Sequence, residues 1–297
     1  MNIYKAIASN KTKTVVFIFL FIVFFSLVFY LIGYSIGNPK FYFIIGLFLS
    51  IATGFASYFY SDKYILFLTK AIPATKSKYF DFYTVAENLA IASGLPKPKL
   101  YVIESPALNA FATGRNPKHS LICVTTGLLE KLDRIELEGV ISHELSHIKN
   151  YDILIASIVS VLAGTLMIAI DFISRGWIYG TRIDRENRNL SYLKVIILLV
   201  VFIITPIVAS LIQLAISRKR EFLADANGAL LTRLPDGLAQ ALEKISTDQN
   251  SLKSVSMSTA HLFISNPIKK KQLSSRLALL FSTHPPIEER IKILRQM

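Results

Sequence analysis

Four long apolar runs divide this sequence, and they limit the possible folds more than any other feature. They cover residues 14–36, 41–60, 153–170 and 195–217. A helix crosses the hydrocarbon core of a bilayer with about 20 apolar residues, because each residue adds about 1.5 Å of length. The runs therefore predict a mainly helical membrane protein with four apolar helices that span the membrane or enter it partway.

The first two runs are separated by only four residues, Gly37, Asn38, Pro39 and Lys40, which predicts a tight helical hairpin. A cleaved signal peptide is the alternative for the first run. We favour a retained anchor, because the apolar stretch is too long for a signal peptide and a second run follows at once. The composition agrees, since only 18% of the 297 residues are charged, against about 25% in soluble domains.

Basic residues mark one side of the predicted membrane. They precede the first run and follow the second and fourth: Lys5, Lys11, Lys13, Lys63, Lys70, Lys76, Lys78, Arg218, Lys219 and Arg220. Because cytoplasmic segments beside membrane spans are rich in Lys and Arg, this side is predicted to be cytoplasmic. The loop between the third and fourth runs carries five further basic residues. Those two runs therefore either cross against the rule or form a hairpin that does not fully span.

The net charge of +13 raises the possibility of nucleic-acid binding. Such a surface needs a basic stripe with stacking aromatics or a known binding module, and the sequence offers neither. Attraction of basic segments to a lipid bilayer explains the excess more simply. We therefore expect the bilayer, and no nucleic acid, as a partner.

The polar region between the second and third runs predicts a small α+β domain. Residues 82–92 have apolar side chains at helical spacing, and the pattern stops at Gly94. Residues 99–103 and 121–125 are rich in β-forming residues and bracket the segment 109–114. We predict one helix followed by a small strand meander.

The string His143-Glu144-x-x-His147 carries the clearest chemical signal. It follows Asp133 and Glu136, which have the spacing of a helix N-cap with a capping box. Two histidines four residues apart share one helical face, so both can bind one Zn²⁺ ion, with Glu144 beside them as a base. Chance is the alternative in a chain with five histidines. The other histidines lack such a pattern, and we expect His119 and His261 on the surface.

A hydrolytic zinc site needs a third protein ligand. Glu221 and Asp225 lie four residues apart on a second predicted helix, where Glu221 can bind the metal and Asp225 can hydrogen bond to a ligand histidine. A surface helix with charge pairs is the alternative. His147 lies six residues before the third run and Glu221 four after the fourth. If the helices continue, a hairpin of those runs brings both to the cytoplasmic surface of the membrane.

Three motifs occur in a fixed order along the chain. They are Asn109-Ala110-Phe111-Ala112, then His143-Glu144-x-x-His147 with Asn150 and Asp152, then Ser217-Arg218-x-Arg220-Glu221-Phe222-x-Ala224-Asp225. Taken together, these motifs resemble those of the HtpX-type membrane zinc endopeptidases. The resemblance covers nearly the whole chain. It implies a stress-response protease of the cytoplasmic (inner) membrane, multi-pass, which cleaves misfolded or unfolded membrane polypeptides at the cytoplasmic face.

The resemblance also implies roles for individual residues. His143, His147 and Glu221 are expected to bind one Zn²⁺ per subunit, with Asp225 behind a ligand histidine. Glu144 is expected to take a proton from a metal-activated water, because Zn²⁺ lowers the pKa of bound water towards about 7.

Two further groups follow from the same resemblance. His284 and Arg290 are candidate stabilisers of the transition state, although a simple terminal helix explains the same residues. Residues Asn109, Ala110, Phe111 and Ala112 are a candidate exposed edge strand that pairs with the substrate backbone, although a plain sheet strand is the alternative.

The resemblance assigns four parts to the chain. We expect a transmembrane hairpin over 1–60, the first half of a cytoplasmic zincin-like α+β protease domain with the zinc helix over 61–152, a second apolar hairpin over 153–217, and the second half with the third ligand over 218–297. A CAAX-type prenyl-protein endopeptidase is the related alternative, and a non-proteolytic zinc-sensing membrane protein is the unrelated one. The first two apolar runs contain no ionisable Asp, Glu, Lys or Arg, which disfavours a transporter-like role.

Overall fold

The computed structural model describes residues 3–180, 217–252, 256, 258–265, 267 and 285–297. The expected fourth apolar helix, except Ser217, and the candidate residue His284 lie outside the described residues. The described elements before the sheet and within it are α1 (Ile3–Ile36), α2 (Pro39–Thr69), β1 (Ile72–Pro73), α3 (Phe80–Ser93), β2 (Lys99–Ile103), β3 (Ala110–Asn116) and β4 (His119–Thr125). The remaining ones are α4 (Thr126–Lys131), α5 (Arg134–Lys149), α6 (Asp152–Gly180), α8 (Arg218–Thr232), α9 (Pro235–Thr247), η1 (Ala260–Leu262) and α11 (Ile287–Leu294).

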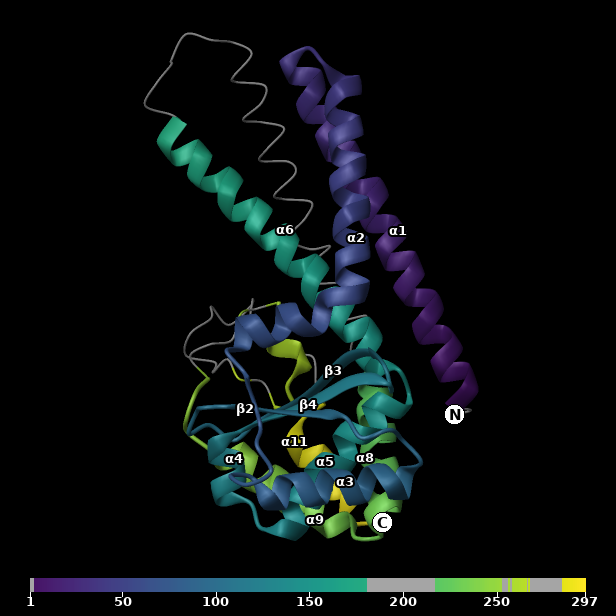
Figure 1. Cartoon of the computed structure of the whole chain (residues 1–297), viewed down its shortest axis with the longest axis vertical. Coiled ribbons are helices and arrows are strands. Elements are labelled where there is room, and N and C mark those ends of the chain that lie inside the picture. Colours follow the sequence, from purple (N-terminus) through teal and green to yellow (C-terminus); the bar gives the residue numbers. More distant parts are fainter. Residues whose placement is uncertain (1–2, 181–216, 253–255, 257, 266, 268–284) are drawn as a thin grey trace.

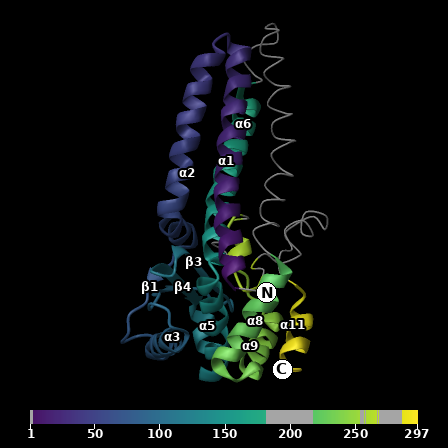
Figure 2. The same ribbon diagram turned by 90° about the vertical axis from the view of Figure 1, so that its right-hand side faces the viewer.

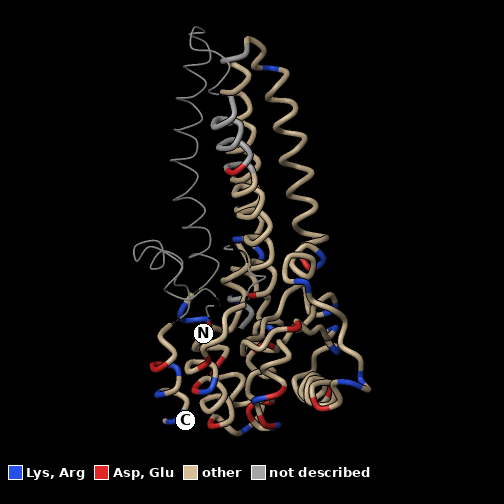
Figure 3. The backbone as a smooth tube through the Cα atoms, turned by 90° about the vertical axis from the view of Figure 1, so that its left-hand side faces the viewer, with Lys and Arg blue, Asp and Glu red and all other residues tan. Residues whose placement is uncertain are grey.

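The predicted hairpin is formed by α1 and α2, which stand side by side above a domain of shorter elements (Figures 1 and 2). Segments Ile7–Tyr34 and Pro39–Thr69 are long and apolar enough to cross a membrane. Charged residues gather in the domain and near the lower ends of the long helices (Figure 3). This separation of charge from the apolar helices is typical of a membrane protein with one large polar face.

Small residues allow α1 and α2 to pack closely. The buried face of α2 includes Gly46, Ser50, Gly54 and Ser57. A Cβ atom on Gly46 would lie 2.5 Å from the Cβ of Phe29 on α1, so a larger residue there would push the helices apart. Small residues at such positions let helix backbones approach each other, which is how helices commonly associate in lipid.

The domain contains a four-stranded sheet with the strand order β1-β2-β4-β3. Strands β2 and β4 lie where the sequence predicts β-rich runs, and β3 lies in the segment between them. The predicted meander is wrong, because β4 lies between β2 and β3 in the sheet and pairs parallel with β2. The hairpin of β3 and β4 therefore folds back so that its second strand fills the sheet. This leaves β3 at the sheet edge, paired with β4 alone among the described strands.

Helix α5 is the centre of the domain, in contact with the sheet and with α3, α8 and α9 (Figure 1). Helix α3 ends at Gly94, whose positive φ of 69° continues the chain out of the helix, as the sequence predicts. One buried apolar cluster joins these layers, and it includes Phe82, Val124, Val140 and Leu242. The result is a rigid frame around α5.

A sharp elbow joins α5 to α6. The two helices meet at 82°, and Tyr151 at the break has a left-handed φ of 59°. Helix α5 therefore does not continue straight into the third apolar segment. The expected position of His147 near the membrane surface depended on such a continuous helix. Instead α5 stays in the domain while α6 rises beside α1 and α2 (Figures 1 and 2).

Candidate metal centre

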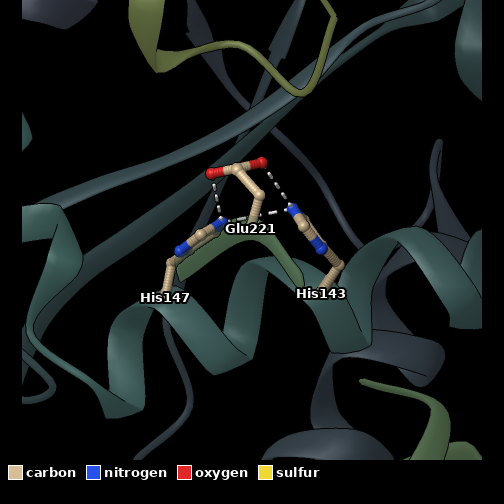
Figure 4. A group of neighbouring side chains, drawn as sticks. All are labelled: His143, His147 and Glu221. Carbon is tan, nitrogen blue, oxygen red and sulfur yellow. Dashed lines mark hydrogen bonds and ion pairs between the residues drawn. The ribbon is translucent and has the colours of Figure 1, made fainter. Parts of the chain in front are cut away.

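Three side chains from two helices meet at one point in the domain (Figure 4). His143 and His147 project from α5, and Glu221 projects from the first turn of α8. The Nε2 atoms of the histidines are 3.1 Å apart, and Glu221 oxygens lie 3.8 Å from His143 Nε2 and 3.6 Å from His147 Nε2. The structure thus brings together the three residues that the sequence predicts as metal ligands.

The spacing of these atoms fits a tetrahedral metal ion. Ligand atoms about 2.0 to 2.1 Å from a zinc ion lie about 3.3 Å from one another at tetrahedral angles. The observed separations of 3.1 to 3.8 Å are close to that value. Two imidazoles and one carboxylate are also the donor set of a hydrolytic zinc site that leaves a fourth position open.

The local sequence explains why the two helices present these groups together. Asp133 and Glu136 form the capping box that starts α5, so both histidines lie on a well-ordered helical face. Helix α8 approaches α5 at Gly228, where a Cβ atom would lie 2.9 Å from Ser142 Oγ. Close contact at this glycine sets Glu221, two turns earlier, against the histidines.

Each ligand histidine is held from behind by a carboxylate. Asp225 Oδ1 lies 2.9 Å from His143 Nδ1, and Asp152 Oδ2 lies 3.0 Å from His147 Nδ1. Such contacts direct the far Nε2 atoms towards a metal. The role of Asp225 behind a ligand histidine was predicted from the sequence. Asp152 was named only as part of a motif, and the one sequence feature that could have suggested its role is that it lies five residues after His147.

Arg290 of α11 lies behind His143. Its Nε and Nη2 atoms donate to the two Asp225 oxygens at 2.8 and 2.7 Å, and its side chain is fully buried. Nη1 also lies 3.8 Å from a Glu221 oxygen. Arg290 therefore contacts two carboxylates of the site, and its two hydrogen bonds hold the Asp225 carboxylate in place.

Burial and charge give the two histidines different pKa values. Burial lowers the pKa of His143 to about 4, although Asp225 opposes this. Burial also lowers the pKa of His147, but Asp152 and Glu221 outweigh it and raise the value to about 9. The carboxylates around His147 therefore favour a positive charge at this point, and a metal cation can replace the proton.

Glu144 lies beside the three ligands and does not belong to the metal-binding group. Burial raises the pKa of its carboxyl to about 7, against the lowering effect of His147. A hydrogen bond from the backbone of Ala112 in β3 also reaches it. A buried carboxyl with a pKa near neutrality suits proton transfer.

The candidate substrate strand lies next to Glu144 at the sheet edge. Asn109, Ala110, Phe111 and Ala112 are all buried, so this edge is not open as the sequence suggests. The Ala110 carbonyl accepts a hydrogen bond of 2.9 Å from Ile264. A short segment after η1 thus covers the edge, which the sequence could not show because that segment lacks strand periodicity.

A cavity opens beside the three ligands. Its lining includes the ligands, Glu144, Ala112 and Ala156, together with His261 of η1 and Ile264 of the covering segment. His261 is buried and lies 3.2 Å from the Ala156 carbonyl oxygen. The expectation that His261 is on the surface is therefore wrong, whereas His119 is exposed as expected.

Comparison with known proteins agrees with this geometry. The model of Peptidase family M48 matches residues 80–297. The Protease HtpX homolog of Caldanaerobacter subterraneus subsp. tengcongensis is 45% identical over 306 residues, covering 100% of this chain and 98% of that protein. The Protease HtpX homolog of Streptococcus uberis is 40% identical over 300 residues, covering 99% of this chain and 100% of that protein.

A further relative and one solved structure extend the comparison. The Protease HtpX homolog of Dictyoglomus thermophilum is 42% identical over 294 residues, covering 99% of this chain and 94% of that protein. The crystal structure of S. mikatae Ste24p matches 98% of this chain and 67% of its own, with a TM-score of 0.49 and 19% identity. The family match spans the metal centre, and the relatives match along the full length. The chain therefore belongs to Peptidase family M48, as one of its HtpX-type metalloproteases.

Proposed function

We propose that the chain is a zinc endopeptidase of the cytoplasmic membrane that cleaves misfolded or unfolded membrane polypeptides at the cytoplasmic face. The observation that carries the proposal is the group of His143, His147 and Glu221, whose ligand atoms lie within 4.8 Å of one another. Each imidazole is backed by a carboxylate, and Glu144 lies alongside. These residues would hold one Zn²⁺ ion per chain.

Zinc held by these ligands supplies a Lewis acid that polarises a carbonyl and lowers the pKa of water. The protein supplies the rest of the reaction. Glu144 accepts a proton from the attacking water on its carboxylate and returns it to the leaving amine. Its raised pKa, about 7, is close to the value that is best for both transfers at neutral pH. Buried Asp225 and Asp152 keep the ligand imidazoles in place.

The substrate is proposed to bind as an extended strand along β3. The Asn109 carbonyl accepts a hydrogen bond from the Thr125 N–H group, so Asn109 faces β4. Because alternate residues of an edge strand turn their backbone N–H and C=O groups away from the partner strand, those of Ala110 and Ala112 point outwards. The outward groups lie next to Glu144 and the ligands. Strand addition reads the backbone and tolerates many side chains, which suits a quality-control protease. The substrate would replace the contact that Ile264 makes with Ala110.

The proposal is tested with full-length protein purified in detergent and an unfolded polypeptide such as casein. We expect cleavage at internal peptide bonds, loss of cleavage after a chelator removes the metal, and recovery when Zn²⁺ is added back. The Glu221→Ala variant is the matched control, because zinc should not restore its activity. Zinc binding without cleavage of any polypeptide would instead support a zinc-sensing protein.

A further inference from the structure

The first membrane helix reaches the metal centre through one polar side chain. Asn10 lies near the start of α1, where that helix runs beside the domain (Figures 1 and 2), and only 3% of its surface is exposed. It lies in the polar start of the segment Ile7–Tyr34, just before the apolar run of that segment begins. A buried amide is costly unless its hydrogen bonds are made, so its partners indicate its purpose.

Those partners belong to the elbow between α5 and α6 and to the start of α8. Asn10 Nδ2 donates to Asp152 Oδ1 at 2.8 Å and to the Asn150 carbonyl at 3.1 Å. Arg220 Nη1 donates to Asn10 Oδ1 at 3.4 Å and to Asp152 Oδ1 at 3.2 Å. All four residues are buried. Asn10 thus joins three helices that meet at the metal centre.

The two oxygens of Asp152 connect this cluster to a metal ligand. Oδ1 receives the donors from Asn10 and Arg220, whereas Oδ2 lies 3.0 Å from His147 Nδ1. The orientation of the carboxylate therefore depends on Asn10, and the orientation of the His147 ring depends on the carboxylate. Arg220 also directly precedes the ligand Glu221 in the sequence.

Lys11, the next residue of α1, contacts the same elbow. Lys11 Nζ lies 4.7 Å from the centre of the Tyr151 ring, within the range of a cation–π contact. Tyr151 is the residue with the left-handed backbone at the 82° break between α5 and α6. Two successive residues of α1 therefore hold the elbow that sets Asp152 behind His147.

We propose that Asn10 is a positioning residue for the metal centre, which fixes Asp152 and through it the imidazole of His147. The proposal rests on the proposed zinc site. In this role α1 is more than a membrane anchor, because it also contributes to the affinity of the site for the metal. Loss of a residue that orients a metal ligand typically weakens metal binding by about 10 to 100-fold.

The chain offers a matched control one helical turn away. Thr14 is also 3% exposed and lies on the same face of α1, and its Oγ1 has no hydrogen-bond partner in the described part of the chain. Thr14→Val removes a buried polar group from the same helix without touching the elbow. A general effect of altering α1 would appear in both variants, whereas a positioning effect would appear only in Asn10→Leu.

The test measures the zinc dissociation constant and the unfolding temperature of the metal-free protein, using full-length chains in detergent. We expect Asn10→Leu to bind Zn²⁺ about 10 to 100-fold more weakly, with a cooperative unfolding transition that shows the metal-free fold is kept. Thr14→Val should bind Zn²⁺ as the unaltered protein does, because it breaks no hydrogen bond in the described part of the chain. The double variant Asn10→Leu/Asp152→Asn should bind zinc about as weakly as Asp152→Asn alone, because both changes act through one carboxylate.

Unchanged zinc affinity in Asn10→Leu, or losses that simply multiply in the double variant, would overturn the proposal. If Asn10→Leu does not accumulate, Asn10→Ala replaces it, since it also removes the Nδ2 donor and adds no charge beside Asp152, and the same weakening is expected. Failure of the unaltered protein to bind zinc would refute the proposed function itself, which is a separate outcome.

Discussion

The two ligand histidines lie in different surroundings, although they are only four residues apart. His143 faces Asp225, whose negative charge is balanced by Arg290. Burial alone would raise the pKa of the Asp225 carboxyl, but the charge of Arg290 and the hydrogen bonds from His143 and Arg290 outweigh it and lower the pKa to about 2. His147 faces Asp152 at the edge of the cavity. The first carboxylate belongs to a rigid ion pair, and the second belongs to the junction of three helices.

Replacing Glu221 or Asp225 should affect zinc retention differently. Glu221→Ala should purify essentially without zinc, because it leaves two protein donors. Asp225→Asn should keep zinc but release it to a chelator about 10 to 100-fold more readily, because its contact is with the far side of His143. Zinc content by mass spectrometry, before and after chelator, distinguishes the two. The opposite order would make Asp225 the ligand.

The residues with a fixed helical spacing could be predicted from the sequence, and those that meet only through the fold could not. His143, His147, Glu221 and Asp225 form two pairs four residues apart, so the spacing places each pair on one helical face. Asn10 is 142 residues from Asp152, and no local pattern connects them. His261 is likewise buried by contacts with α6 that no periodicity reveals.

The elements themselves were easier to predict than their connections. The apolar hairpin, the capped helix α5 and the strand Lys99–Ile103 all follow from periodicity and turn residues. The sheet order was predicted wrongly, because a meander and the observed arrangement use the same strands and differ only in which ones pair. The short strand Ile72–Pro73 has too few residues to show a period.

The proposed binding of substrate along strand β3 is tested by a proline substitution. Ala110→Pro should lower kcat/KM for an unfolded polypeptide by at least about tenfold, because proline removes an outward backbone N–H group at the proposed substrate edge. Zinc content should stay near that of the unaltered protein. Ile72→Pro, in the strand at the opposite edge of the sheet, is the control for the general cost of a proline. Equal activity of the two variants would place the substrate elsewhere.

The whole molecule combines an apolar hairpin with a domain that holds every described candidate residue. The chain ends both lie at the domain end of the molecule, far from the tip of the hairpin (Figure 1). A bilayer crossed by this hairpin would have the start of α1, the loop before α3 and the end of α11 on one side. Asn10 then links the membrane part to the chemistry.

The orientation of the molecule is tested by tags. Tags at Met1, Ser77 and Met297 should all be protected from protease added outside intact cells, because Lys and Arg flank these segments. The same tags should become accessible after the membrane is opened. A tag placed between Gly37 and Asn38 is the control, since it should be cut from outside. Accessibility of any of the first three in intact cells would reverse the topology.

The most direct test of the account separates metal binding from catalysis at a single residue. Glu144→Gln keeps the size of the side chain and leaves His143, His147 and Glu221 unchanged. A general base typically contributes about 10²- to 10⁴-fold to the rate. We therefore predict that the purified variant retains close to one zinc ion per chain while its cleavage of an unfolded polypeptide falls by that factor. A variant that loses zinc, or that cleaves at the unaltered rate, would contradict the account.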